Sequence, residues 1–175
     1  MKSEALVEWH HLVGGSFIAK VNRFAAMVEV TGIERYTYIP NPTPAAELLT
    51  PDADVLLIRM SPHHKTKYRL LAARIGSLWA TLDTSIPNVV FREGIKRSLF
   101  REFIGRTVRK ENVRLGKSII DFQLSGRRIT YVEVKSYTLV VNGTALFPDA
   151  VTERGSRHLR ELEAAAAGGA QAFMV

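Results

Sequence analysis

Short apolar and alternating stretches fill the first half of the chain and predict β-strands. They are SFIAKVNRFAAMVEV (16–30), RYTYIP (35–40), DVLLIRM (54–60), TKYRLLAARIG (66–76) and SLWATLDTS (77–85). The first stretch is long enough for one bent strand, and Gly76-Ser77 predicts a turn between the last two. About five strands in roughly 70 residues are typical of a small β-barrel, for which the five-stranded OB-fold is the best-known plan.

The pattern changes at residues 85–88, SIPN, where a proline interrupts the strands and predicts a domain boundary. We therefore expect one domain over residues 1–85 and a second over residues 86–175. Within NVVFREGIKRSLFREFIG (88–105), apolar residues recur at helical spacing with charges between them. This segment predicts a helix that Gly105 ends.

The second domain continues with two predicted strands, SIIDFQL (118–124) and RITYVEVKSYTLVV (128–141), joined near Ser125-Gly126. Residues 152–167 predict a helix capped by Thr152, and AQAFMV (170–175) predicts the opening of another strand. The order helix, strand, strand, helix, strand indicates an α/β domain, so the whole chain belongs to the mixed α+β class. Because the chain stops inside the last predicted strand, we expect this domain to be truncated at its C-terminus.

Composition excludes several kinds of protein. The absence of cysteine excludes a disulfide scaffold, a Cys-ligated zinc finger, an iron–sulfur cluster and a thiol nucleophile. The chain has no run of 18 apolar residues that would predict a transmembrane helix, and its start, MKSEALVEWHH, lacks the apolar stretch of a signal peptide. We therefore expect a cytoplasmic protein with no membrane partner.

Positive charge is concentrated in one part of the chain. The net charge is +7, and residues 92–117 alone hold nine Lys or Arg against three Glu. A concentrated basic segment attracts polyanions, of which nucleic acid is the commonest. The alternative is a solvated helix face on an ordinary basic protein.

Three side chains of the second domain form a pattern with chemical meaning. Asp121 lies in one predicted strand, and Glu133 and Lys135 lie in the next. Residues i and i+2 of a strand share a face, so Glu133 and Lys135 project together. Two carboxylates can hold Mg²⁺ or Mn²⁺, and a lysine can stabilise negative charge that develops on a phosphate. This pattern resembles the D…ExK arrangement of PD-(D/E)xK nuclease-like sites; the alternative is an ion pair on an exposed strand edge.

The metal hypothesis requires a particular strand register. A two-residue turn at Ser125-Gly126 would put Asp121 and Glu133 on opposite faces of the sheet. A three-residue loop would pair Asp121 with Tyr131 and bring Glu133 to the same face, two residues along. The hypothesis therefore needs a loop with an odd number of residues, or a bulge.

The residues around this pattern resemble a known family. YVEVKSYTLVVNGTALFPDAVTERGSRHLREL (131–162) closely resembles the signature stretch of the sugar fermentation stimulation protein A (SfsA) family. Further matches are KTKY at 65–68, TSIPN at 84–88 with Arg92-Glu93 after it, and Asp121-Phe122. The FPDAVTERG run at 147–155 is long and specific, and together the matches span residues 16–175.

The resemblance implies an OB-like barrel, a nuclease-like second domain, DNA binding and a divalent-metal site. It makes Asp121, Glu133 and Lys135 the catalytic candidates, and Glu93, Asp121 and Glu133 the ligands for Mg²⁺ or Mn²⁺. If active, the protein would be an endonuclease or exonuclease that hydrolyses phosphodiester bonds. The alternative is a non-catalytic, DNA-binding regulator of sugar (maltose) metabolism genes.

Several cations are candidates for contacts with DNA, single- or double-stranded. Lys65, Lys67 and Arg69 alternate and so share one strand face, where OB barrels often bind single strands. The remaining candidates are Arg92, Arg154, Arg157 and His158, the last three in the closing helix. A second copy of the chain, in a homodimer, is the further partner considered.

Overall fold

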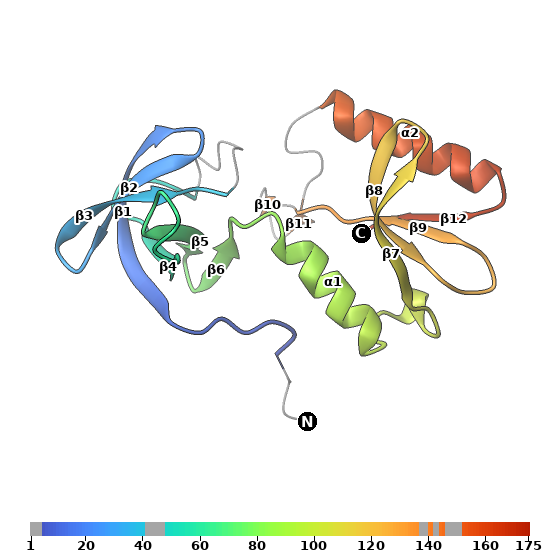
Figure 1. Ribbon diagram of the computed structural model, residues 1–175, viewed down its shortest axis with the longest axis horizontal. Coiled ribbons are helices and arrows are strands. Elements are labelled where there is room, and N and C mark those ends of the chain that lie inside the picture. The colour runs from blue at the N-terminus through green and yellow to red at the C-terminus, as the bar shows by residue number, and fades with distance from the viewer. Residues whose placement is uncertain (1–4, 41–47, 137–139, 142–143, 146–151) are drawn as a thin grey trace. The chain divides into compact units, whose positions relative to one another are not determined.

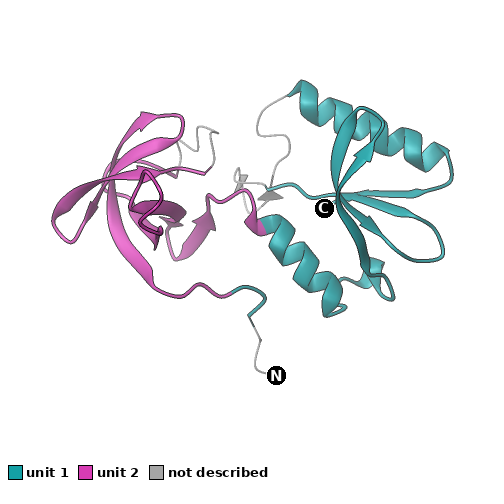
Figure 2. Ribbon diagram, in the orientation of Figure 1, with its two compact units in different colours: residues 1–7, 87–175 teal, residues 8–86 magenta. Residues whose placement is uncertain are grey.

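The computed structural model describes residues 5–40, 48–136, 140–141, 144–145 and 152–175 (Figure 1). Residues 147–151, which begin the FPDAVTERG run, lie outside this part of the chain. The chain divides into two compact units, residues 8–86 and residues 87–175 together with the N-terminal segment 1–7 (Figure 2). No helix in the described ranges is long and apolar enough to cross a membrane.

The first unit is a closed β-barrel. Its strands are β1 (Leu12–Asn22), β2 (Ala25–Val30), β3 (Ile33–Tyr38), β4 (Asp54–Arg59), β5 (Tyr68–Ile75) and β6 (Leu78–Thr81). They follow the order β3-β2-β1-β4-β5-β6, and a parallel pairing of β3 with β5 closes β1 to β5 into a ring. The five-stranded OB-like barrel predicted from the sequence is therefore confirmed, with β6 added as a hairpin on β5. Val28, Leu57 and Leu70 are fully buried in its core.

One strand prediction in the barrel is wrong. Residues 16–30 form not one bent strand but an antiparallel hairpin of β1 and β2 that turns at Arg23 and Phe24. The Asn22 carboxamide oxygen accepts a hydrogen bond from the Phe24 backbone N–H at 2.9 Å, which stabilises the tight turn. Gly15 permits the hairpin to pack, because a Cβ there would lie 2.7 Å from the Glu29 carbonyl oxygen.

The second unit is a four-stranded sheet between two helices. Its elements are α1 (Ile86–Lys96), the 3₁₀ turn η1 (Arg101–Phe103), β7 (Val108–Leu115), β8 (Ser118–Leu124), β9 (Thr130–Glu133), β10 (Val140–Val141), β11 (Thr144–Ala145), α2 (Glu153–Ala167) and β12 (Gln171–Met174). The sheet order is β12-β9-β8-β7, with β12 parallel to β9 and the other pairs antiparallel. The small β10–β11 pair lies outside this sheet.

Alternation along β8 places the core of helix α1 against one face of the sheet. Phe122 and Leu124 are fully buried and pack in one cluster with Phe91 and Ile95 of α1. Asp121, between Ile120 and Phe122, alternates away from this cluster, as residues one apart on a strand do, yet its carboxylate still accepts a hydrogen bond from Asn88 of α1. The second helix, α2, contacts β8 and β12 (Figure 1).

The predicted helix over 88–105 ends earlier than expected. α1 stops at Lys96, and Ser98 adopts a left-handed conformation with a φ of 54°. The chain then folds back, so that the rings of Phe100 and Phe103 both lie 5.4 Å from the ring of Phe91. This aromatic packing outweighs the local helical pattern, and it leaves Leu99 57% exposed.

Two strand predictions in the second unit also need correction. The segment 128–141 was expected to be one strand, but β9 ends at Glu133. There the backbone N–H of Val134 donates to the Asp121 carboxylate at 2.8 Å instead of pairing with the backbone of β8. The sequence pattern also missed β7, because only one of its eight side chains, Val113, is buried and the apolar signal is weak.

Candidate functional site

Strands β8 and β9 bring Asp121 and Glu133 face to face. The register pairs Phe122 with Val132 and Gln123 with Tyr131, so Asp121 stands opposite Glu133, one pair beyond the last. Residues 125–129 form the connecting loop, which has an odd number of residues, as the metal hypothesis requires. The loop holds five residues, so the case of a three-residue loop, which would have paired Asp121 with Tyr131, does not arise. The carboxylates are therefore directly opposite rather than two residues apart.

The Asp121 carboxylate is held by two donors. Oδ2 accepts a hydrogen bond from the Val134 backbone N–H at 2.8 Å, and Oδ1 accepts one from the Asn88 side-chain amide at 3.0 Å. Burial raises the pKa of Asp121 above its ordinary value, and the nearby charge of Glu133 adds to the effect. The hydrogen bonds from Val134 and Asn88 and the charge of Lys135 oppose the rise in this pKa without cancelling it.

The Glu133 carboxylate is buried, with 3% of its surface exposed, and three groups surround it. Its Oε1 is in hydrogen-bond contact with both the Lys135 ammonium and the Nδ1 of His158, the latter at 2.5 Å. Its Oε2 faces the backbone N–H of Asp121 at 3.4 Å. A buried carboxylate is stable only when it is paired and hydrogen-bonded, and Lys135 and His158 supply these partners.

Glu93 does not join this pair. Among the described residues, no three His, Asp or Glu side chains gather in a way that would hold a metal ion. Glu93 binds Lys96 at 2.7 Å, and this contact lowers the pKa of Glu93. The reason is helical geometry: Asn88 of α1 faces Asp121, and a residue five positions later is rotated by about 140° around the helix axis.

Two side chains that were predicted to contact nucleic acid bind other residues of the chain instead. The Arg92 guanidinium forms a bidentate ion pair with Glu111 at 2.7 and 2.9 Å. His158 is 2% exposed on the inner side of α2, where it touches Glu133. Because it is buried, His158 contacts Glu133 in the candidate site, not nucleic acid as expected.

The other predicted cations of α2 are exposed. Arg154 lies one turn before His158 on the same face of the helix, which places it on the side of the site. Arg157 lines a surface hollow of about 580 Å³ together with Lys117, Glu153, Ser156, Arg160 and Glu161. Three cations and two carboxylates thus face this hollow.

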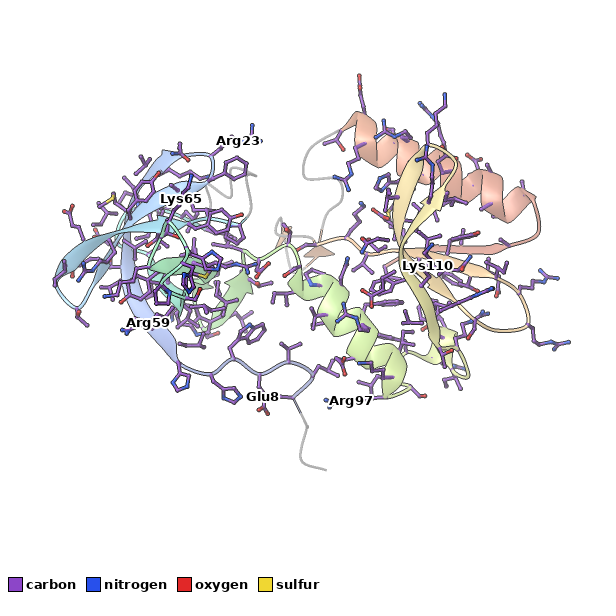
Figure 3. The ribbon with its side chains drawn as sticks, in the orientation of Figure 1. Glu8, Arg23, Arg59, Lys65, Arg97 and Lys110 are labelled. Atoms are coloured by element: carbon purple, nitrogen blue, oxygen red, sulfur yellow. The ribbon has the colours of Figure 1, made fainter. Side chains whose placement is uncertain are left out.

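On the barrel, Lys65 and Lys67 are exposed in the loop between β4 and β5. Arg69 is not available beside them, because its guanidinium pairs with the buried Asp83. Aromatic rings accompany these lysines on the barrel: Tyr36 is 48% exposed and Tyr38 36%. Figure 3 labels Arg23 at the rim of the barrel; Lys65 and Arg23 are both exposed.

A further exposed ring lies in the β1–β2 turn. Phe24 is 40% exposed, and the Arg23 guanidinium lies 4.5 Å from the centre of its ring. The Asn22 amide donates to the Tyr36 hydroxyl at 3.3 Å, which connects this turn to β3. The barrel therefore exposes cations and flat rings together.

Comparison with known proteins identifies the family. A model described as "SfsA N-terminal OB domain" matches residues 18–82, and one described as "Sugar fermentation stimulation protein RE domain" matches residues 85–175. The chain belongs to the sugar fermentation stimulation protein family. This confirms the resemblance predicted from the sequence, with an OB domain followed by an RE domain.

Relatives within the sugar fermentation stimulation protein family are bacterial and archaeal. The homologue of Caldanaerobacter subterraneus is 42% identical over 86% of this chain and 67% of its own length. That of Desulfitobacterium hafniense is 42% identical over 92% of this chain and 70% of its own length. A solved structure titled "The structure of Pyrococcus Furiosus SfsA in complex with Ca2+" is 28% identical, with a TM-score of 0.90, over 98% of this chain and 74% of that one.

Sequence reasoning missed one residue of the site and the place of another. In the sequence, Asn88 was noted only as the last residue of the TSIPN stretch. No spacing rule connects it to Asp121, 33 residues away. His158 was grouped with its charged neighbours on α2. Its position four residues before the buried Leu162 is the signal that could have placed it on the inner face of α2.

Proposed function

We propose that this chain binds DNA and hydrolyses phosphodiester bonds with the help of Mg²⁺ or Mn²⁺ at Asp121 and Glu133. One observation carries the proposal: two carboxylates from adjacent strands face each other, and the Lys135 ammonium contacts one of them. The family's RE domain covers all three residues. Glu93 is not included among the metal ligands.

The donors suit a hard divalent cation. Mg²⁺ is usually held by one or two carboxylates, and waters and substrate phosphates complete its coordination. Asp121 and Glu133 supply two carboxylates, and the repulsion between them, which helps to raise the pKa of Asp121, would be relieved by a cation. The relative from Pyrococcus furiosus is titled as a complex with Ca²⁺, another cation that prefers oxygen ligands.

When bound, such an ion polarises the phosphate and lowers the pKa of a bound water. Lys135 holds a positive charge beside Glu133 and is 22% exposed, so its ammonium can stabilise the negative charge that develops on the phosphate. Arg154, exposed one turn before His158, binds and orients the substrate phosphate. The two carboxylates offer only oxygen atoms as ligands, and these attract a cation rather than an anion.

The barrel supports binding of the DNA strand. Exposed aromatic rings next to cations are the means by which OB barrels bind single strands, since each base has a face that stacks. Tyr36 and Tyr38 supply the rings, and Lys65 and Lys67 supply charge. On the second unit, β7 exposes Arg109, Lys110 (labelled in Figure 3) and Arg114, which add to the attraction for a phosphate backbone.

Cleavage and binding are measured together. The pure chain is incubated with labelled single- and double-stranded DNA, with Mg²⁺, with Mn²⁺ or with EDTA, beside Asp121→Ala and Lys135→Ala. We expect metal-dependent cleavage by the wild type and none by either variant. Glu93→Ala is the matched control, a carboxylate of the same unit outside the site, and it should cleave as the wild type does.

Two results would contradict parts of this proposal. Salt-sensitive binding without cleavage, unchanged in the variants, would favour the non-catalytic regulator of sugar metabolism genes. Binding that is independent of salt concentration would contradict the electrostatic basis of DNA binding, because contacts with phosphates release counterions.

A further inference from the structure

We propose that the two helices of the second unit hold one carboxylate each in position for the metal, with His158 of α2 as the positioning residue for Glu133 and Asn88 of α1 as that for Asp121. This rests on the proposed function, since it needs a cation at these carboxylates. Neither residue is a ligand or a catalytic group in this scheme. Each acts through the carboxylate that it contacts.

The contacts at Glu133 separate the roles of its two oxygens. Oε1 is bound by the Lys135 ammonium and by the Nδ1 of His158, so rotation of the carboxylate would break two hydrogen bonds. Oε2 is left on the side of Asp121, where its contact is the backbone N–H at 3.4 Å. His158 therefore keeps Oε2 turned toward the opposite carboxylate.

The contacts at Asp121 mirror this arrangement. Oδ2 is held by the Val134 backbone and Oδ1 by the Asn88 amide. Asn88 lies in the first turn of α1, whose Phe91 packs against Phe122 of β8. The position of the Asn88 amide is thus set by the core of the unit.

The donor atom of His158 can be assigned. Glu133 is paired with an ammonium and is therefore an ionised carboxylate, which can only accept. The Nδ1 of His158 must then carry a proton and donate it to Oε1. The positioning role accordingly depends on a donor at this particular ring position.

A purely space-filling role makes a different prediction. His158 is buried four residues before Leu162, which is also buried and has no polar group. If His158 only filled space, glutamine, the larger amide, would replace it better than asparagine. If its Nδ1 donor matters, asparagine is the better substitute, because its amide nitrogen occupies about the place of Nδ1, whereas that of glutamine lies nearer the place of Nε2.

The experiment measures Mn²⁺ binding by isothermal titration calorimetry on the full chain and compares wild type, His158→Asn and His158→Gln. We expect His158→Gln to weaken Mn²⁺ binding about 10- to 100-fold, the usual loss when a residue that orients a metal ligand is removed. His158→Asn should stay within about 3-fold of wild type. Thermal unfolding of each metal-free variant checks that it is folded.

Asn88→Ala provides a second measurement that does not depend on α2. It removes the donor to Asp121 and should weaken Mn²⁺ binding about 10-fold or more. Equal losses in His158→Asn and His158→Gln, or a smaller loss in His158→Gln, would overturn the positioning role of His158 while the metal site stands. A wild-type chain that binds no Mn²⁺ would overturn the metal site and this inference together.

Discussion

At the scale of single residues, the two carboxylates of the site differ in how well nearby donors and positive charges stabilise their negative charge. Glu133 is more deeply buried than Asp121, yet it has an ammonium and an imidazole N–H on one oxygen. Among the described residues, the donors that hydrogen-bond to the Asp121 carboxylate, Asn88 and the Val134 backbone, are both neutral. Ionised Asp121 therefore costs folding free energy whenever no cation is bound, and its raised pKa expresses that cost.

Asp121→Asn should stabilise the metal-free protein at neutral pH. The pKa of Asp121 is higher in the folded chain than its ordinary value of 3.8, so the folded state holds this proton more tightly than the unfolded state. The resulting destabilisation is absent below the unfolded pKa and is fully present above the folded pKa. Chemical denaturation in EDTA at pH 7 should show a higher free energy of unfolding for the variant.

The pH dependence supplies the control for this variant. The difference between Asp121→Asn and wild type should shrink as the pH falls and vanish below 3.8, where Asp121 is protonated in both states. Saturating Mn²⁺ should reverse the order, because only the wild type keeps both carboxylates. An Asp121→Asn chain less stable than wild type at pH 7 in EDTA would show that burial does not dominate at this position.

At the scale of elements, local pattern and tertiary packing compete. The apolar spacing over 88–105 predicted one helix, but the helix ends at Lys96 and the following residues fold back. The ring of Phe91 stacks on that of Phe100 and meets those of Phe103 and Phe122 at 5.4 and 5.0 Å. In a continued helix Phe100 would be rotated by about 180° from Phe91, so this stacking could not form.

Phe91→Ala and Leu99→Ala test this boundary as a pair. Phe91 is 2% exposed and central to the aromatic cluster, so its truncation should cost about 3–5 kcal/mol of stability. Leu99 was expected on the buried face of a longer helix but is 57% exposed, so its truncation should cost about 0.5 kcal/mol or less. Urea denaturation measures the free energy of unfolding of both variants. Comparable losses would indicate that Leu99 is buried, as in the longer helix.

At the scale of the whole molecule, the two units carry different parts of the proposed function. The barrel exposes rings and cations, and the second unit holds the paired carboxylates. Binding of a strand and chemistry on it can therefore be impaired separately, by substitutions in one unit or in the other.

Tyr36→Ala and Tyr38→Ala should weaken binding of single-stranded oligonucleotides and leave Mn²⁺ binding unchanged. Loss of one stacked base contact costs about 1–3 kcal/mol, and a duplex should lose less because its bases are already stacked. Fluorescence anisotropy with labelled DNA measures both forms. Ile33→Ala is the matched control, since Ile33 lies on the same strand and is 51% exposed but has no ring; an equal effect in Ile33→Ala would argue against stacking.

The amino-acid sequence by itself determined the two-domain fold class and the acidic and basic residue types proposed for the candidate site. The strand-rich first half predicted the barrel, and Asp121, Glu133 and Lys135 were identified as a set before their positions were known. Such features are local, since alternation along a strand and short motifs depend on residues near one another in the chain.

Only the tertiary structure decided which side chains meet. The five-residue loop places Asp121 directly opposite Glu133, the rotation of α1 offers Asn88 rather than Glu93, and α2 buries His158 against Oε1 of Glu133. Each of these depends on register and packing between segments that are 12 to 33 residues apart. Periodicity shows which face of an element is apolar, but the partner of that face is chosen by the packing of the whole unit.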